Sequence, residues 1–199
     1  MFKNIACWSC GWDGKIWVFL CPNCHSVQSV QPCSAFQVMG IPVSLDIDEK
    51  VLEKNYLERQ QQLHPDHFIK ASATEQLYAT QQTANINRAY NILKDRLTRA
   101  EALLAARLGV EACRDEQAPN KLLMQLMEVR EALETSESLA DLESLNGEVV
   151  AFCSDAWNTL RQKCLAENWS KAQEQLIRVR YWQKMLQKTT EKLALVRGT

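Results

Sequence analysis

The chain has 199 residues, of which 46% are hydrophobic and 24% charged, so it can bury a core and does not have the composition of a disordered protein. Its net charge is −1, and the charges balance within regions, with nine basic and nine acidic residues in 36–109 and eleven of each in 120–199. This balance leaves no basic surface for nucleic acid, and no apolar run approaches the ~20 residues of a membrane span. With 6 Gly and 5 Pro, and apolar residues recurring every three and four positions after residue 35, we expect a mainly α protein behind a small N-terminal module.

The N-terminal 35 residues contain two CxxC pairs, Cys7 with Cys10 and Cys21 with Cys24. Each pair suits a knuckle whose thiolates converge on one ion, and two knuckles complete the tetrahedral sulfur set that Zn²⁺ prefers. A four-cysteine site has no open coordination position, so we expect one structural zinc ion per chain that supplies the folding energy of this short piece. Iron in a rubredoxin-like site is the main alternative, and disulfides are disfavoured in a reducing cytosol.

The rest of this module predicts a small hairpin around the metal. Residues 15–20 are β-branched and aromatic, as in a short strand, and Trp8, Trp12 and Trp17 would cover the knuckles. His25 follows the last cysteine pair and is expected to be a bystander. Cys33 is expected to belong to the next helix.

Two helices are predicted next. Residues 36–42 resemble a short helix with Gly40 as its terminator and Pro42 preventing its extension. A second helix is expected from about 46 to 63, with Asp46 as N-cap and Glu49 close to the capping-box position.

A third helix is expected over about 74–94 and a fourth over 97–109, the latter closed by Gly109. The third would pack against the second through an apolar stripe. The predicted members of that stripe are Leu77, Ala84, Ile86, Ala89, Tyr90 and Leu93.

Between the second and third helices lies the tripeptide His64-Pro65-Asp66. A proline disfavours the α conformation in the residue before it, so the second helix should end at or just before His64. This leaves His64 and Asp66 on an exposed loop between two antiparallel helices. Taken alone, the loop also fits a solvated turn, or a metal or hydrolase site that includes His67.

The His-Pro-Asp loop between antiparallel helices resembles the signature of a J-domain, and residues 86–93 resemble the corresponding J-domain segment. The resemblance implies docking to an HscA/DnaK-type chaperone and stimulation of its ATP hydrolysis. The chaperone-binding residues it implies are His64, Pro65, Asp66, Arg59 and Lys54. Glutamines at 60–62 stand where J-domains typically carry Lys or Arg, which indicates either a looser, less salt-dependent encounter or a dedicated chaperone with a less acidic surface.

The C-terminal part predicts a bundle. Residues 110–119 lack apolar periodicity and are expected to be a linker, and helices fit about 120–134, 139–164 and 170–196. Ser170 would begin the last helix. The middle helix carries its apolar residues on one face, at Leu139, Leu142, Leu145, Val149, Phe152, Ala156 and Leu160. Three helices joined by short turns form an antiparallel bundle.

The CxxC pairs, the J-domain and a bundle opening with residues 123–131 together resemble the HscB/Jac co-chaperones of iron-sulfur cluster biogenesis, in the branch with an N-terminal tetracysteine module. The resemblance covers essentially the whole chain. It implies that the bundle binds an IscU-type scaffold protein and that the J-domain presents this scaffold to the chaperone. The scaffold-binding residues it implies are Leu123, Met124, Met127, Glu128, Glu131 and Tyr181. By periodicity alone, Leu123 and Met127 also fit the bundle core.

We therefore expect a non-enzymatic adaptor with a metal module at 1–35, a J-domain at 36–109, a linker at 110–119 and a scaffold-binding bundle at 120–199. No secretory or transit signal is evident at the N-terminus, so a cytoplasmic protein is expected, or a mitochondrial matrix protein if a eukaryotic presequence has been removed. The alternative from another class is a zinc-ribbon protein that binds nucleic acid.

Overall fold

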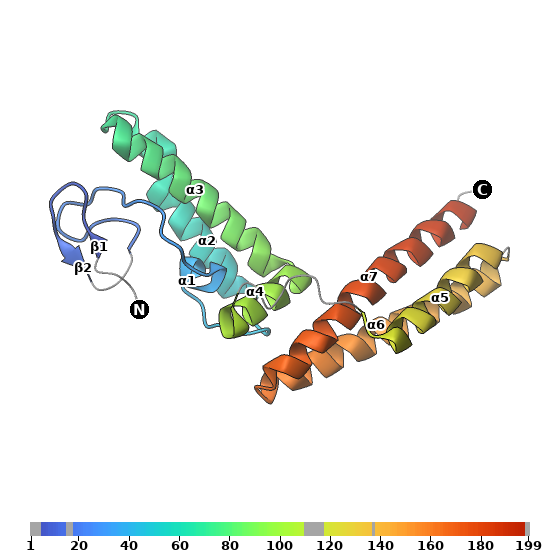
Figure 1. Cartoon of the computed structure of the whole chain (residues 1–199). Coiled ribbons are helices and arrows are strands. Elements are labelled where there is room, and N and C mark those ends of the chain that lie inside the picture. The colour runs from blue at the N-terminus through green and yellow to red at the C-terminus, as the bar shows by residue number, and fades with distance from the viewer. Residues whose placement is uncertain (1–4, 15–17, 110–117, 137, 198–199) are drawn as a thin grey trace. The chain divides into compact units, whose positions relative to one another are not determined.

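The computed structural model describes the chain except for residues 1–4, 15–17, 110–117, 137 and 198–199. Two compact units are present, Met1–Ala102 and Leu103–Thr199 (Figure 1). The mainly α fold is confirmed, since the described residues form seven α-helices, one 3₁₀ turn and two strands of two residues each. None of the described helices is long and apolar enough to cross a membrane.

The N-terminal module consists of two small loops closed by short backbone pairings. Strand β1 (Ile5–Ala6) pairs antiparallel with β2 (Asp13–Gly14) across the first CxxC turn. An isolated bridge joins Leu20 to Val27 across the second turn. The strand predicted over 15–20 is wrong for 18–20 apart from this bridge, because the backbone pairs locally around each knuckle; residues 15–17 lie outside the described part.

Helix α1 (Ala35–Met39) has a complete cap at each end. The Ser34 side chain accepts from the Gln37 N–H, and the Gln37 side chain accepts from the Ser34 N–H. Cys33 therefore precedes the helix and does not belong to it, contrary to the prediction. The helix ends at Gly40, whose φ of 64° is the left-handed conformation that favours glycine.

Helices α2 (Glu49–Leu63) and α3 (Ala73–Lys94) form the predicted antiparallel hairpin. Helix α2 is capped by Asp48, whose carboxylate accepts from the N–H groups of Lys50 and Val51 at 2.9 and 3.3 Å. Asp46 as N-cap was therefore wrong, because the cap is the residue whose side chain reaches these free N–H groups. Ser72 caps α3 in the same way.

The buried face of α3 differs from the predicted stripe. Its fully buried members are Ala79, Gln82, Ile86, Ala89 and Leu93. Leu77 and Ala84 are exposed, since each lies two residues from a buried position and so points to the opposite side of the helix. Helix α4 (Arg96–Leu108) follows, and the Arg99 guanidinium donates to the Leu93 carbonyl at the end of α3 at 2.7 Å.

The second unit contains α5 (Asn120–Thr135), α6 (Leu139–Leu165) and α7 (Trp169–Arg197), close to the predicted bounds. Asn168 caps α7 through its side chain and Ser170 does not, because the Asn168 amide oxygen accepts from the Lys171 N–H at 3.3 Å. Leu139 is exposed at the start of α6 and does not join the core.

The centre of the bundle is Trp182, which has no exposed surface and stacks on Phe152 with ring centroids 4.6 Å apart. Truncating Trp182 to Ala removes a large buried ring, and we expect the free energy of unfolding of the bundle to fall by about 3–5 kcal/mol. The control Val150→Ala, on the exposed side of α6, should change it by less than about 0.5 kcal/mol. Urea denaturation followed by circular dichroism measures both, and equal effects would contradict the described core.

Candidate functional site

The four cysteines of the two CxxC pairs converge on one point. All four Sγ atoms lie within 4.8 Å of one another, and the pairs Cys7–Cys24 and Cys10–Cys21 are each 3.7 Å apart. These separations are far longer than a disulfide bond of about 2.05 Å. They match the edge of about 3.8 Å of a tetrahedron with metal–sulfur bonds of about 2.3 Å. The cluster therefore fits a tetrahedral metal ion, and both zinc and iron suit such a sulfur set.

Each knuckle turns through a residue in the left-handed conformation directly after its CxxC pair. Gly11 has φ 73° and His25 has φ 59°. Their N–H groups donate to the carbonyls of Cys7 and Cys21, both at 2.9 Å. His25 is thus a turn residue and not part of the cysteine cluster.

Polar groups beside Cys7 and Cys24 favour the ionised form of these two thiols. Burial raises the pKa of the Cys7 thiol, but hydrogen bonds from the backbone N–H groups of Cys10 and Ser9 and from Ser26 outweigh it and lower that pKa to about 5. The Ser26 hydroxyl, 2.9 Å from the Cys24 sulfur, lowers the pKa of Cys24. Burial raises the pKa of Cys21 to about 11. A metal ion would offset the burial of this last thiolate.

The His-Pro-Asp tripeptide lies at the turn of the hairpin, as predicted. His64 ends α2 with φ −59° and ψ 127°, and Pro65–Phe68 form one 3₁₀ turn. The His64 Nδ1 accepts from the Asp66 backbone N–H at 3.3 Å and lies 3.6 Å from the Asp66 carboxylate. The two side chains are 52% and 75% exposed. The turn therefore presents an imidazole and a carboxylate outward in a fixed local arrangement.

The two cations expected beside this turn have different environments. Lys54 is exposed and forms an ion pair with Glu58 at 3.8 Å. The Arg59 guanidinium lies over the Phe19 ring of the module at 5.6 Å and donates to the Asn55 carbonyl at 3.0 Å. Burial lowers the pKa of Arg59. Arg59 is thus packed against the module, and only Lys54 of the two faces solvent.

On α5, the residues predicted for scaffold binding are exposed. Leu123, Met124 and Met127 are 39%, 64% and 71% exposed, whereas the buried positions of this helix are Leu122, Leu126, Val129 and Leu133. Glu128 and Glu131 are exposed as well. Leu123 and Met127 therefore do not belong to the bundle core.

Tyr181 of α7 is level with Leu123 along the bundle. The Lys192 ammonium donates to the carbonyls of Leu133 and Ser136, which fixes the register of α7 on α5. Both helices run in the same direction (Figure 1), so about ten residues back from this contact lie Leu123 on one helix and Tyr181 on the other. Tyr181 is 36% exposed, and we call Leu123, Met124, Met127 and Tyr181 the apolar patch.

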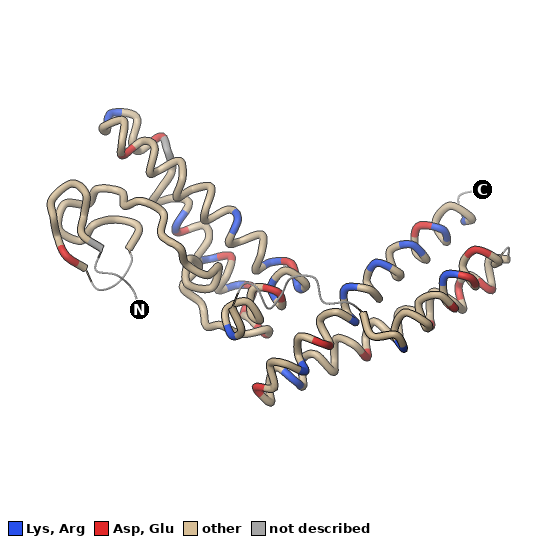
Figure 2. Tube along the Cα trace, in the orientation of Figure 1, with Lys and Arg blue, Asp and Glu red and all other residues tan. Residues whose placement is uncertain are grey.

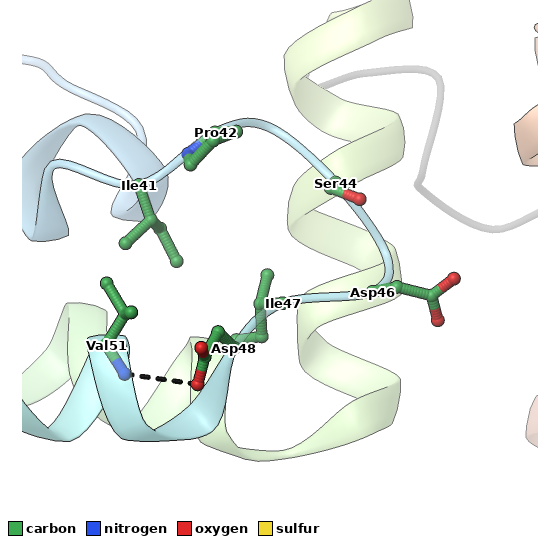
Figure 3. A pocket seen from close by; sticks show the side chains of 7 residues that line it. All are labelled: Ile41, Pro42, Ser44, Asp46, Ile47, Asp48 and Val51. Atoms are coloured by element: carbon green, nitrogen blue, oxygen red, sulfur yellow. Dashed lines mark hydrogen bonds between the residues drawn. The ribbon is translucent and has the colours of Figure 1, made fainter.

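A small cavity of about 220 Å³ lies where the chain enters α2 (Figure 3). Its lining is Ile41, Pro42, Ser44, Asp46, Ile47, Asp48 and Val51. The Asp48 carboxylate is engaged in capping α2, and neither His64 nor His67 reaches the cavity lining. The cavity therefore does not bring the turn histidines together with acidic residues, as a hydrolytic site would require.

Sequence reasoning missed the polar residues that support the cysteine cluster. The amides of Gln28 and Asn23 donate to the sulfurs of Cys7 and Cys10, both at 3.4 Å. The spacing of the cysteines gives no signal for these partners. Gln82 of α3 does have a signal in the sequence. It lies in the helical stripe of residues 79, 82, 86, 89 and 93, and a glutamine on a buried helix face indicates a buried polar contact.

A family model for the HSCB C-terminal oligomerisation domain matches residues 118–190. The chain is 35% identical to a co-chaperone protein HscB homolog of Haemophilus ducreyi, over 79% of this chain and 96% of that protein. It is 29% identical to the iron-sulfur cluster co-chaperone protein HscB of Mus musculus, over 94% of this chain and 82% of that protein.

Solved structures of HscB-type co-chaperones have the same fold as this chain. The crystal structure of human co-chaperone protein HscB superposes with a TM-score of 0.83 at 27% identity, covering 94% of this chain and 98% of that one. The chaperone HscB from Vibrio cholerae gives a TM-score of 0.67 at 29% identity, covering 80% and 96%. The Jac1 co-chaperone from Saccharomyces cerevisiae, at 18% identity and a TM-score of 0.59, shares the fold.

The cysteine cluster predicts one tightly held metal ion per chain, which we expect to be zinc. Cys24→Ser should lose the ion, because three thiolates and a hydroxyl no longer form the closed sulfur set. The matched control Cys33→Ser changes a cysteine outside the cluster and should keep it. Elemental analysis of the purified chains after dialysis tests this expectation. A wild-type chain without stoichiometric metal would contradict the site, and one carrying iron would overturn the zinc assignment alone.

Proposed function

The chain belongs to the HscB family of co-chaperones, and we propose that it brings an IscU-type scaffold protein to an HscA/DnaK-type chaperone and stimulates ATP hydrolysis by that chaperone. Family membership makes it a J-type co-chaperone of iron-sulfur cluster biogenesis, and its relatives are named as co-chaperones and not as enzymes. The observation that carries the proposal is the outward-facing His64-Pro65-Asp66 turn at the end of a helical hairpin. The division into 1–35, 36–109, 110–119 and 120–199 is part of this proposal, as is a cytoplasmic or mitochondrial matrix location.

In this proposal the turn acts on the active site of another protein. The hydrogen bond from the Asp66 N–H to the His64 ring holds the imidazole before the partner arrives, which reduces the ordering cost of binding. The exposed Asp66 carboxylate is an acceptor for a cationic donor of the chaperone. The ATP chemistry remains in the chaperone.

We propose that shape contributes more than charge to chaperone docking. Of the three cations on α2, Arg59 packs against the module, Lys54 is paired with Glu58, and the exposed Lys50 lies in the first turn of the helix, far from the tripeptide. Charges of both signs occur on the hairpin helices (Figure 2). Such a surface steers a partner weakly, so association should depend little on salt.

The apolar patch of α5 and α7 is the proposed surface for the scaffold. Three apolar side chains and one aromatic ring with acidic residues beside them have the make-up of a protein-docking site. Methionines adapt their shape to a partner at small cost. Glu128 and Glu131 would form the polar rim.

The alternative of a nucleic-acid-binding zinc ribbon lacks support from charge. Between residues 5 and 35 the charged residues are Asp13 and Lys15. Nucleic-acid affinity derives mainly from cations that neutralise phosphates, and residues 1–35 carry only two lysines, Lys3 and Lys15.

We expect His64→Gln to abolish stimulation of the chaperone ATPase while leaving the helical content of the chain unchanged, because His64 is exposed and contributes no core packing. His67→Gln, in the same 3₁₀ turn but outside the tripeptide, is the matched control and should retain stimulation. The measurement is the steady-state rate of ATP hydrolysis by an HscA/DnaK-type chaperone, titrated with each variant. Full stimulation by His64→Gln would refute the role of the turn.

Replacing Leu123, Met127 and Tyr181 together by Ala should weaken scaffold binding by at least ~2 kcal/mol, about 30-fold, since central apolar residues dominate such interfaces. The matched control is Leu165→Ala with Leu195→Ala, two exposed leucines of the same bundle outside the patch. Isothermal titration calorimetry with the scaffold gives both affinities. A triple variant that keeps its affinity within about 1 kcal/mol would exclude the patch as the hot spot.

A further inference from the structure

The segment Ser26–Gln28, directly after the second knuckle, is enclosed between the cysteine cluster and helix α3. All three residues are buried, and Val27 has no exposed surface. Both the metal module and the hairpin belong to the first compact unit. A buried segment shared by two elements is the place where their stabilities can be linked.

Gln28 contacts both elements at once. Its side-chain amide donates to the Cys7 sulfur at 3.4 Å and to the Ser26 carbonyl at 2.8 Å. Its backbone carbonyl accepts from the Gln82 amide of α3 at 2.9 Å. Gln82 is 0% exposed, and its own side-chain oxygen has no partner in the described part. The bond to the Gln28 carbonyl therefore compensates for the burial of the Gln82 amide, and losing it would leave that amide without a partner.

Two further contacts join the metal module to α3. The Val27 N–H donates to the Glu75 carboxylate at 3.0 Å. Trp8, the neighbour of Cys7, donates from its indole N–H to the Val27 carbonyl at 2.7 Å, and its ring meets Tyr78 edge-on with centroids 5.8 Å apart. Positions 75, 78 and 82 share one face of α3. This face therefore touches the backbone around the second knuckle and the residue beside a ligand of the first.

We propose that Gln82, Glu75 and Tyr78 of α3 are positioning residues of the metal site, so that metal binding and folding of the helical hairpin form one linked equilibrium. The metal draws the four cysteines together and so orders the 26–28 segment, which then presents its N–H and carbonyl groups to α3. In return, α3 holds Gln28, whose amide orients the Cys7 sulfur. Linkage requires the two effects to be equal in free energy.

The linkage bears on the His64-Pro65-Asp66 turn without depending on its proposed role. The 3₁₀ turn packs against α3, the same helix that holds the module. Loss of metal should therefore loosen the helix that supports the turn, although no cysteine lies near the tripeptide in sequence. The inference concerns binding and folding only and stands whether or not the chaperone is the partner.

The test compares two adjacent glutamines in the full-length chain. Gln82→Met keeps the volume of a buried side chain and removes its hydrogen bond, and Gln81→Met makes the same change at an exposed site one residue away. Zn²⁺ affinity is measured by competition with a chromogenic chelator, and Co²⁺ absorption reports the tetrahedral thiolate site. We expect Gln82→Met to weaken Zn²⁺ binding about 10-fold or more, because it frees Gln28, whose amide is the outer-shell partner of the Cys7 sulfur. Gln81→Met should stay within about twofold.

The reciprocal measurement is amide hydrogen exchange of α3 with and without chelator. Chelation should speed exchange around positions 78–86 in the wild-type chain and in Gln81→Met, and should have a smaller effect in Gln82→Met, which has already lost the link. The inference would be overturned if Gln82→Met bound Zn²⁺ with wild-type affinity, or if chelation left the amide exchange rates of α3 unchanged in the wild-type chain. If circular dichroism shows that Gln82→Met is not folded, Glu75→Ala at the module surface replaces it in the test. A Zn²⁺ affinity of Glu75→Ala within twofold of wild type would then overturn the inference.

Discussion

The buried stripe of each helix determines which of its residues remain available to partners. On α5 the core takes positions 122, 126, 129 and 133, and this leaves Leu123, Met124 and Met127 outside. On α2 and α3 the buried faces meet each other, and the chain can reverse between them only where Pro65 interrupts the helix. Both proposed binding surfaces are therefore consequences of helix phase and of one proline.

The features that depend on local sequence could be predicted, because their physics is local. Four cysteines in two CxxC pairs specify a metal cluster, and a proline after His64 specifies the end of a helix. The errors arose where contacts between distant segments decide. The choice of Asp48 over Asp46 is a local exception, set by which carboxylate reaches the free N–H groups of α2. The pairing of Arg59 with Phe19, by contrast, joins residues forty apart. The phase of α3 follows from packing on α1, α2 and the module, so that Gln82 is buried and Leu77 exposed. The roles of the turn and of the apolar patch remain predictions.

The position of Arg59 has a second consequence. A guanidinium that stacks on an aromatic ring and bonds to a carbonyl is lost as a free charge, although the sequence still shows an arginine. Together with Gln60–Gln62, this leaves no freely exposed cation between residues 59 and 63 at the end of α2. The module thus influences the hairpin surface, since Phe19 supplies the ring that holds Arg59.

If the turn binds the chaperone and the apolar patch binds the scaffold, as proposed, neither surface needs high affinity. Once the scaffold is bound to the patch, its encounter with the chaperone bound at the turn takes place within one complex, and the effective concentration replaces the bulk concentration. Moderate affinity at each surface would let both partners leave after each cycle, because affinity differences lie mainly in the dissociation rate. Weak surfaces on one chain are therefore suited to an adaptor that must release its cargo, whereas a tight binder would retain it.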